Sequence, residues 1–222
     1  MALLPRDAAR HPGVLSPGYR SSLLRAPSQP LVALPSAEDE AGPVFAPPGE
    51  LDHDLLRNGA QGGGSPIGER LLVHGVVRDR GGRPLPGVLV EIWQANAGGR
   101  YRHARDGYRA PLDPHFAGAG RTLTDRDGRY HFFTVRPGAY PWRNGHEDGW
   151  RPSHIHFSLT GPQWAQRLVT QMYFEGDPLN ASCPILGTVP GEAGRRALIA
   201  LLDPGAFVAQ DHRAYRFDLV LR

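Results

Sequence analysis

Short runs of alternating apolar and polar residues, separated by turn sequences, constrain the fold of this chain most. The run Leu71–Arg78 reads Leu-Leu-Val-His-Gly-Val-Val-Arg, and the turn Asp79-Arg-Gly-Gly-Arg-Pro follows it. Side chains on a strand alternate between two faces, so such a run can bury one face and expose the other. The chain of 222 residues contains 28 Gly and 22 Pro, which lie between these runs. This distribution is typical of an all-β fold with many turns.

The same pattern continues to the C-terminus. Further strands are predicted over residues 88–94, 122–124, 129–135, 154–160, 167–174 and 215–221. Apolar residues close to helical spacing predict one helix over Glu192–Leu202. The predicted fold class is therefore all-β, a β-sandwich core with long loops, an extended N-terminal arm and one short C-terminal helix.

Residues 1–65 differ from the rest of the chain, because they are rich in Pro, Ser, Gly and Ala and show little periodicity. They contain only a short predicted helical turn near Asp54. A segment of this length without its own secondary structure is uncommon in a compact domain unless it is functional or packs on a partner. We predict that residues 1–65 form an arm packing on a partner chain and that residues 66–222 form the β-sandwich domain.

Composition excludes several classes of function. All 25 basic residues are arginine, the net charge is only +3, and no basic run indicates a nucleic-acid surface. Cys183 is the single cysteine, so neither an intramolecular disulfide nor a cysteine-based zinc site can form. The first residues do not resemble a signal peptide, and no apolar run approaches the roughly 20 residues of a membrane span. A cytoplasmic protein that binds neither nucleic acid nor membrane is expected.

The sequence His154-Ile155-His156 lies in a predicted strand, so both imidazoles point to the same face. Tyr140 precedes this pair, and Tyr108 lies further upstream in a Gly- and Pro-rich segment. A free phenol has a pKa of about 10, but a bound cation can displace its proton. Two phenolates with two imidazoles would suit a trivalent iron, in contrast to the two-His, one-carboxylate set of Fe(II) oxygenases.

The residues alone leave a plainer alternative open. A His-x-His pair on a strand is often structural, and tyrosines in loops often only pack. By spacing alone, Tyr108 and Tyr140 are not distinguished from Tyr101, Tyr130 or Tyr173. The pattern therefore indicates a candidate histidine-containing metal site on a β-sandwich and goes no further.

Several longer segments resemble the intradiol ring-cleaving dioxygenases. These are residues 91–103, 110–114, 118–125, 136–144 and 150–157, together with 17–27 and 66–70 near the arm and 171–178. The resemblance covers nearly the whole chain. It implies an enzyme with a non-haem Fe(III) held by Tyr108, Tyr140, His154 and His156. It further implies cleavage of protocatechuate (3,4-dihydroxybenzoate) by O2 between its hydroxylated carbons, giving 3-carboxy-cis,cis-muconate in the β-ketoadipate pathway of aromatic degradation.

The resemblance also implies roles for individual residues. Tyr140 would be catalytic as the iron ligand that leaves and helps accept a proton, and Arg151 would stabilise negative charge beside the ring. The residues implied to line the substrate site are Gln171, Trp142, Ile185, Tyr19 and Arg25. A homologous alpha chain is the implied partner, forming alpha-beta units in a larger oligomer.

Three alternatives compete with this interpretation. Residues 75–90 and 125–130 resemble β-sandwich modules that serve only structural or adhesive roles, but such modules lack a tyrosine and histidine quartet. A related enzyme acting on catechol or hydroxyquinol would carry a helical N-terminal domain, which this Pro-rich N-terminus does not suggest. A histidine-based zinc hydrolase would need a carboxylate ligand and a general base, and Glu147 and Asp148 lie in an apparent loop.

Overall fold

The computed structural model describes residues 52–57, 64–103, 106–142, 149–162, 166–208 and 211–221. Its strands are β1 (Arg70–Arg78), β2 (Leu89–Trp93), β3 (Ala119–Leu123), β4 (Arg129–Val135), β5 (Tyr140–Pro141), β6 (Trp150–Arg151), β7 (His154–Thr160), β8 (Arg167–Phe174), β9 (Ile199–Leu202), β10 (Arg213–Arg216) and β11 (Leu219–Val220). The helical elements are η2 (Pro178–Ser182), η3 (Leu186–Thr188), α3 (Glu192–Arg196) and η4 (Pro204–Ala206). The all-β prediction is confirmed. Within the described residues, no helix is long and apolar enough to cross a membrane.

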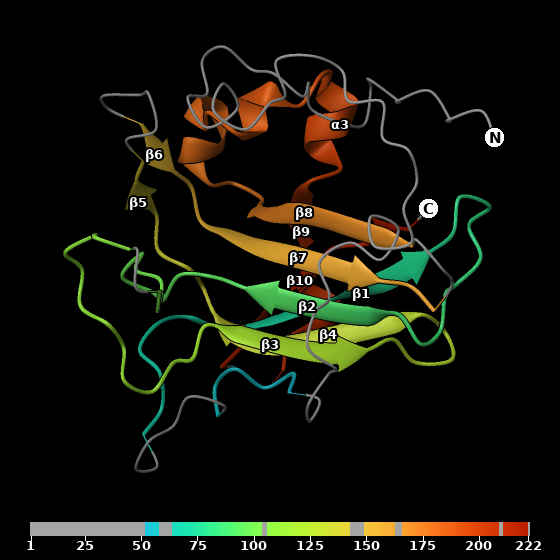
Figure 1. The fold of residues 1–222 in the computed structure, drawn as a ribbon, viewed down its shortest axis with the longest axis horizontal. Helices are drawn as coiled ribbons and strands as arrows, with labels where there is room; N and C mark the ends of the chain where they lie inside the picture. Colours follow the sequence, from blue (N-terminus) through green and yellow to red (C-terminus); the bar gives the residue numbers. More distant parts are fainter. Residues whose placement is uncertain are drawn as a thin grey trace, which may run out of the picture.

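The strands form one nine-stranded sheet that folds back on itself. Its order is β11-β1-β10-β9-β8-β7-β2-β3, with β4 pairing against β1, while β5 and β6 form a separate hairpin. In Figure 1, β3, β2, β7 and β8 lie in the near layer, and β10 and β9 lie behind them. Because β9 pairs with both β8 and β10, it connects the two layers of the sandwich.

The hydrophobic core lies between these layers and follows the alternation read from the sequence. On β1, Leu71, Val73 and Val77 are fully buried, and on β7 Ile155 and Phe157 are fully buried against them in one cluster. Burying each such side chain contributes roughly 1.5–3 kcal/mol. The two histidines of β7 lie on the opposite face of the strand and do not belong to this core.

Residues 52–57 belong to the sandwich, although the sequence analysis placed them in the arm. The Asp52 amide and carbonyl pair with Arg121 on β3, while the Leu55 amide donates to the Phe133 carbonyl on β4 at 2.8 Å. The Leu55 side chain is fully buried in the main core. This short segment thus joins the two ends of the sheet, and the rest of the predicted arm up to residue 51 lies outside the described residues.

The helix prediction over residues 192–202 is only partly correct. Helix α3 ends at Arg196, and Ile199–Leu202 forms strand β9 instead. Tyr173 lies opposite Ile199 in the parallel pairing of β8 and β9, and Tyr215 lies opposite Leu202 in the antiparallel pairing with β10. The ladder hydrogen bonds offered by two neighbouring strands outweigh a helical pattern that only local sequence supports.

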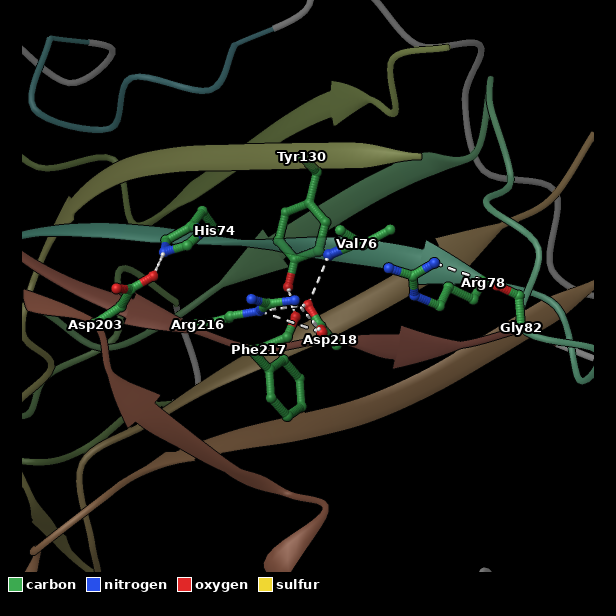
Figure 2. Close-up of polar contacts among 9 residues, drawn as sticks. All are labelled: His74, Val76, Arg78, Gly82, Tyr130, Asp203, Arg216, Phe217 and Asp218. Carbon is green, nitrogen blue, oxygen red and sulfur yellow. Dashed lines mark hydrogen bonds and ion pairs between the residues drawn. The ribbon is translucent and has the colours of Figure 1, made fainter. Parts of the chain in front are cut away.

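The last predicted strand, residues 215–221, is interrupted at Phe217 and Asp218, as Figure 2 shows, while its register with β1 is the same on both sides. The Phe217 carbonyl turns toward the core, where it accepts a hydrogen bond of 2.5 Å from the buried Tyr130 hydroxyl. The Asp218 carboxylate takes its place in the ladder by accepting the Val76 amide at 3.0 Å. A Cβ on Gly75 would lie 2.0 Å from the Phe217 carbonyl oxygen, so this approach requires glycine.

Candidate metal centre

The candidate site lies on the outer face of the layer formed by β2, β7 and β8. His154 and His156 alternate with the core residues Ile155 and Phe157, so both imidazoles point away from the core. The strand register places three further side chains beside them. His154 lies opposite Tyr173, and His156 lies opposite Gln171 on β8 and Trp93 on β2. Figure 1 shows hairpin β5–β6 and the helical turns that follow β8 at this end of the sandwich.

The orientation of His154 is fixed by its backbone surroundings. Its side chain is 1% exposed, and Nδ1 donates to the Pro152 carbonyl at 2.7 Å. Because a carbonyl can only accept, the proton sits on Nδ1 and Nε2 presents a lone pair. This Nε2 lies 3.3 Å from the hydroxyl oxygen of Tyr140. A hydrogen bond from the second ring nitrogen to a carbonyl is the usual support of a metal-binding histidine.

His156 is held by ring stacking instead. Its imidazole lies parallel to the Trp93 indole, with ring centroids 4.9 Å apart and an interplanar angle of 5°. Its Nε2 lies 3.2 Å from the hydroxyl oxygen of Tyr101. The two imidazole rings are 5.0 Å apart, centroid to centroid. Each histidine therefore faces one tyrosine hydroxyl, and the four groups form a single cluster.

Tyr101 reaches this cluster from the loop after β2 and Tyr140 reaches it from strand β5, and the two segments are packed against each other. The rings of Tyr101 and Tyr140 meet edge to face with centroids 5.5 Å apart. Gly99 lies against the residue before Tyr140, since a Cβ on Gly99 would lie 2.3 Å from the Ala139 carbonyl oxygen. Its φ of 83° also favours glycine. Asn96 fixes the turn by accepting the amides of Gly98 and Arg100 through its Oδ1 at 2.9 and 3.0 Å.

Tyr108 lies further along the same segment, and its expected role as the first phenolate ligand stays a prediction. The Asp106 carboxylate fixes the backbone at both tyrosines. It accepts the Tyr101 amide at 2.7 Å and the Tyr108 amide at 2.8 Å. Within the described residues, no hydrogen bond or ring contact joins Tyr108 to the two histidines or to Tyr140. The Tyr101 hydroxyl lies beside His156 in this structure, a contact that spacing alone did not single out. The turn directly after β2 fixes Tyr101 beside the sheet.

Burial sets the protonation of all four groups. It lowers the pKa of His154 well below its usual value and that of His156 to about 4, with the Arg151 charge acting in the same direction. Both imidazoles are therefore neutral at pH 7 and able to donate to a cation without first losing a proton. Burial raises the pKa values of Tyr101 and Tyr140, so without a cation both stay protonated phenols.

This donor set fits a trivalent iron. Nε2 of two neutral imidazoles and two phenol oxygens converge, and a nearby trivalent charge reverses the effect of burial on phenol ionisation. Within the described residues, no group of three or more His, Cys, Asp and Glu side chains could hold a metal ion. The carboxylate-containing sets of zinc hydrolases and Fe(II) oxygenases are therefore not found in this part of the chain.

A second group of polar side chains adjoins the cluster. The Arg151 side chain is 2% exposed, and its Nη2 donates to the Gln171 Oε1 and, at 3.1 Å, to the Tyr173 hydroxyl. Its guanidinium carbon lies 5.9 Å from the Trp142 ring centroid. Arg151 pairs with Tyr140 across hairpin β5–β6, which places its charge beside a proposed ligand. Three of the predicted site residues, Arg151, Gln171 and Trp142, are thus brought together.

The remaining predicted pocket residues have different outcomes. Ile185 is half-buried and packs against a second apolar cluster made of Tyr173, Cys183 and Leu186. This places it next to the polar group, and its role as a wall against substrate stays a prediction. Tyr19 and Arg25 lie outside the described residues.

Comparison with known proteins identifies the class of enzyme. Residues 40–222 match the family model described as "Dioxygenase", and residues 4–37 match "Protocatechuate 3,4-dioxygenase beta subunit N terminal". The chain is 50% identical to a protocatechuate 3,4-dioxygenase beta chain of Burkholderia cepacia, covering 99% of this chain and 94% of that one. It is 33% identical to a 6-chlorohydroxyquinol 1,2-dioxygenase of Cupriavidus pinatubonensis, covering 75% of this chain and 56% of that enzyme.

Solved structures agree. The dioxygenase domain of a carbohydrate-binding fusion protein from Streptomyces sp. SirexAA-E matches with a TM-score of 0.56 and 30% identity, over 81% of this chain and 92% of that one. The 3-chlorocatechol 1,2-dioxygenase of Rhodococcus opacus 1CP matches with a TM-score of 0.58 and 25% identity, over 81% of this chain and 70% of that one. The fold and the site define a ring-cleaving dioxygenase, and the chain belongs to the intradiol dioxygenase family. Within that family, its first residues match the model of a beta subunit.

Proposed function

We propose that this chain binds non-haem Fe(III) through Tyr108, Tyr140, His154 and His156 and cleaves protocatechuate with O2 to 3-carboxy-cis,cis-muconate. The observation that carries the proposal is the pair of imidazoles whose Nε2 atoms face the phenol oxygens of Tyr140 and Tyr101 at 3.3 and 3.2 Å. Tyr101, which faces His156, is the competing candidate for the place of Tyr108. When bound, the iron would supply Lewis acidity that favours the ionised form of a catechol's two hydroxyls.

The other residues of the site have roles that follow from their positions. Tyr140 faces His154 and neighbours Tyr101, so a proton on its hydroxyl has hydrogen-bonding partners on two sides. Arg151 keeps its charge, because Tyr173 and Tyr140 outweigh the effect of burial and raise its pKa. A fixed, buried positive charge beside the cluster can stabilise an aromatic substrate that becomes more anionic. Trp142 and Ile185 supply apolar surface close to this charge.

The choice of protocatechuate rests on similarity. The relative that is 50% identical over 99% of this chain carries that substrate in its name, and residues 4–37 match a beta-subunit N-terminal model. We infer that the N-terminal arm packs on a homologous alpha chain, that Tyr19 and Arg25 on it line the substrate pocket, and that the alpha-beta units assemble further. A role in the β-ketoadipate pathway and a cytoplasmic location stay predictions.

The test is the visible absorption of the purified protein, together with an iron assay and O2 uptake. We expect about one iron per chain, a broad tyrosinate-to-iron band, and a shift of that band when protocatechuate is added without O2. Protocatechuate should then be consumed with equal amounts of O2. A protein co-purified with its alpha chain that stays colourless in Fe(III) and consumes no O2 contradicts the proposal.

A further inference from the structure

We propose that Tyr173 is a positioning residue that holds Arg151 and Gln171 as one rigid unit beside the metal centre. The proposal rests on the proposed function, because it concerns how the Arg151 charge is aimed at that reaction. Neither the sequence analysis nor the roles implied by the resemblance assigned anything to Tyr173. The contacts around its hydroxyl single it out.

The hydroxyl of Tyr173 closes a three-membered ring of hydrogen bonds. Arg151 Nη2 donates to the Tyr173 oxygen at 3.1 Å and to the Gln171 Oε1, and the Tyr173 hydroxyl donates to the same Oε1 at 2.9 Å. The hydroxyl thus accepts from one partner and donates to the other. Replacing it with hydrogen removes two of the three bonds and leaves only the Arg151–Gln171 contact.

Arg151 depends on these bonds for its orientation, because its other polar contacts within the described residues are few. It lies on β6, a strand of two residues, and its Nε is buried without a hydrogen-bond partner in the described part of the chain. A long side chain with one remaining bond can adopt several rotamers, whereas two bonds from the same Nη2 fix the plane of the guanidinium. The Tyr173 hydroxyl therefore sets the direction of the Arg151 charge.

Tyr173 itself is rigid. Its side chain is 1% exposed and packs with Cys183 and Leu186 in the second apolar cluster. Cys183 Sγ lies 3.9 Å from the Tyr173 oxygen and in turn accepts the Leu186 amide at 3.4 Å. This connects the hydroxyl to the loop before η3. Through Tyr173, Arg151 is thus held in place relative to strand β8 and to this loop.

The Tyr173 ring and its hydroxyl serve different neighbours, which allows them to be tested separately. The ring stacks on His154 with centroids 5.9 Å apart and an interplanar angle of 27°. Phenylalanine keeps this stacking surface and loses only the hydroxyl. Tyr173→Phe should therefore leave the histidine ligand in place and release Arg151 alone.

The experiment compares full-length Tyr173→Phe with wild type, each purified with any associated chain. We expect unchanged iron content and an unchanged tyrosinate-to-iron band, with kcat for protocatechuate lowered roughly ten-fold. KM should be nearly unchanged, because the lost interaction acts mainly when the substrate gains negative charge. The matched control is Tyr130→Phe, which removes a buried hydroxyl bound to the Phe217 carbonyl far along the chain from the site. It should lower the Tm and leave kcat unchanged.

Two further readouts separate positioning from general structural support. Crystal structures should show the Arg151 guanidinium displaced in Tyr173→Phe and unmoved in Tyr130→Phe. On an Arg151→Ala background, Tyr173→Phe should lower kcat less than two-fold further, because both changes then remove the same effect. Equal kcat values for Tyr173→Phe and wild type, or full additivity with Arg151→Ala, overturn the proposal. A wild-type protein without iron or turnover would instead contradict the proposed function.

Discussion

Tyr101 and His156 are separated by 55 positions in the sequence, yet the Tyr101 hydroxyl oxygen lies 3.2 Å from His156 Nε2. This contact joins the loop after β2 to the strand β7 and completes a pair of phenol and imidazole groups that Tyr140 and His154 repeat at 3.3 Å. The cluster therefore has two similar halves. Each half consists of one tyrosine, Tyr101 from a loop or Tyr140 from β5, and one histidine from β7.

The first prediction concerns which tyrosine binds iron. We expect Tyr108→Phe to lose most of the tyrosinate-to-iron absorption and to retain iron at least ten-fold more weakly, because the variant removes one anionic ligand. The measurement is iron content after dialysis against a chelator, together with the visible spectrum.

Tyr101→Phe is the matched control for this change, since Tyr101 lies seven residues earlier in the same segment and faces His156. It should keep both its colour and its iron. Loss of iron in Tyr101→Phe with retention in Tyr108→Phe would assign the ligand to Tyr101 instead.

The second prediction concerns Arg151. Arg151→Ala should retain iron and lower kcat roughly 10²- to 10³-fold, the range seen when one charge-stabilising donor is removed. The control is Arg167→Ala, because Arg167 lies on β8 with an exposed side chain at the other end of the strand. Steady-state O2 uptake checks both, and turnover of Arg151→Ala within two-fold of wild type would rule out the role.

The third prediction concerns the close approach at Gly99 of the two segments that carry Tyr101 and Tyr140. Gly99→Ala places a Cβ 2.3 Å from the Ala139 carbonyl oxygen on a backbone with φ of 83°. We expect a loss of about 2–4 kcal/mol in the free energy of unfolding, and weaker iron binding, because Tyr101 and Tyr140 must move apart.

Gly82 offers a control with the same backbone strain and no clash. Its φ is also 83°, and nothing lies within 4 Å of the Cβ that alanine would add. Gly82→Ala should lose only about 1–2 kcal/mol and bind iron normally. Urea unfolding and iron titration of both variants measure the difference, and equal effects in the two would show that the loop contact is unimportant.

The fourth prediction concerns the pH dependence of the iron-free protein. Burial lowers the pKa of His156 from 6.5 to about 4, so below pH 6.5 the unfolded chain binds a proton that the folded chain does not. Stability contributed by this group is complete above pH 6.5 and is lost as the pH falls toward 4. Linkage gives a loss of about 2 kcal/mol between pH 7.5 and 5. His154 acts in the same direction.

The loss of stability that His156 causes between pH 7.5 and 5 can be separated from the effect of carboxylate titration. Asp79 and Asp125 have pKa values lowered below 3.8 by hydrogen bonds from the backbone, so their effects appear in more acidic solution. Urea unfolding of the iron-free protein at several pH values should show a smaller slope for His156→Gln than for wild type. Identical slopes would contradict a neutral, buried His156.

The strands could be predicted from sequence where one face is buried. The run Leu71–Arg78 and the segment 154–160 show the alternation plainly, and both form strands in the structure. Strand β9 could not be predicted, because Ile199–Leu202 exposes Leu201 and Leu202 and its conformation depends on pairing with β8 and β10. The interruption of this strand at Phe217 likewise depends on Gly75, which lies far away in the sequence.

The site was predictable to the extent that it lies on strands. His154, His156 and Gln171 are related by strand periodicity and register, which act over a few residues. Tyr101 is placed by a loop, and the direction of a loop depends on contacts such as that of Gly99 with Ala139. Spacing carries no information about such contacts, so Tyr101 and Tyr108 could not be told apart by spacing.

The pairing of residues 52–55 with both β3 and β4 has a consequence for the behaviour of the protein at high concentration. The exposed edge of a sheet is a template on which another chain can add a strand and begin an aggregate. Here the amides of Asp52, Leu55, Arg121 and Phe133 are all used within the chain, at 2.7–2.9 Å. Residues 52–55 therefore cover the edges at β3 and β4, which would otherwise be open. Cutting the chain just after Leu55 should therefore promote aggregation before it affects the metal centre.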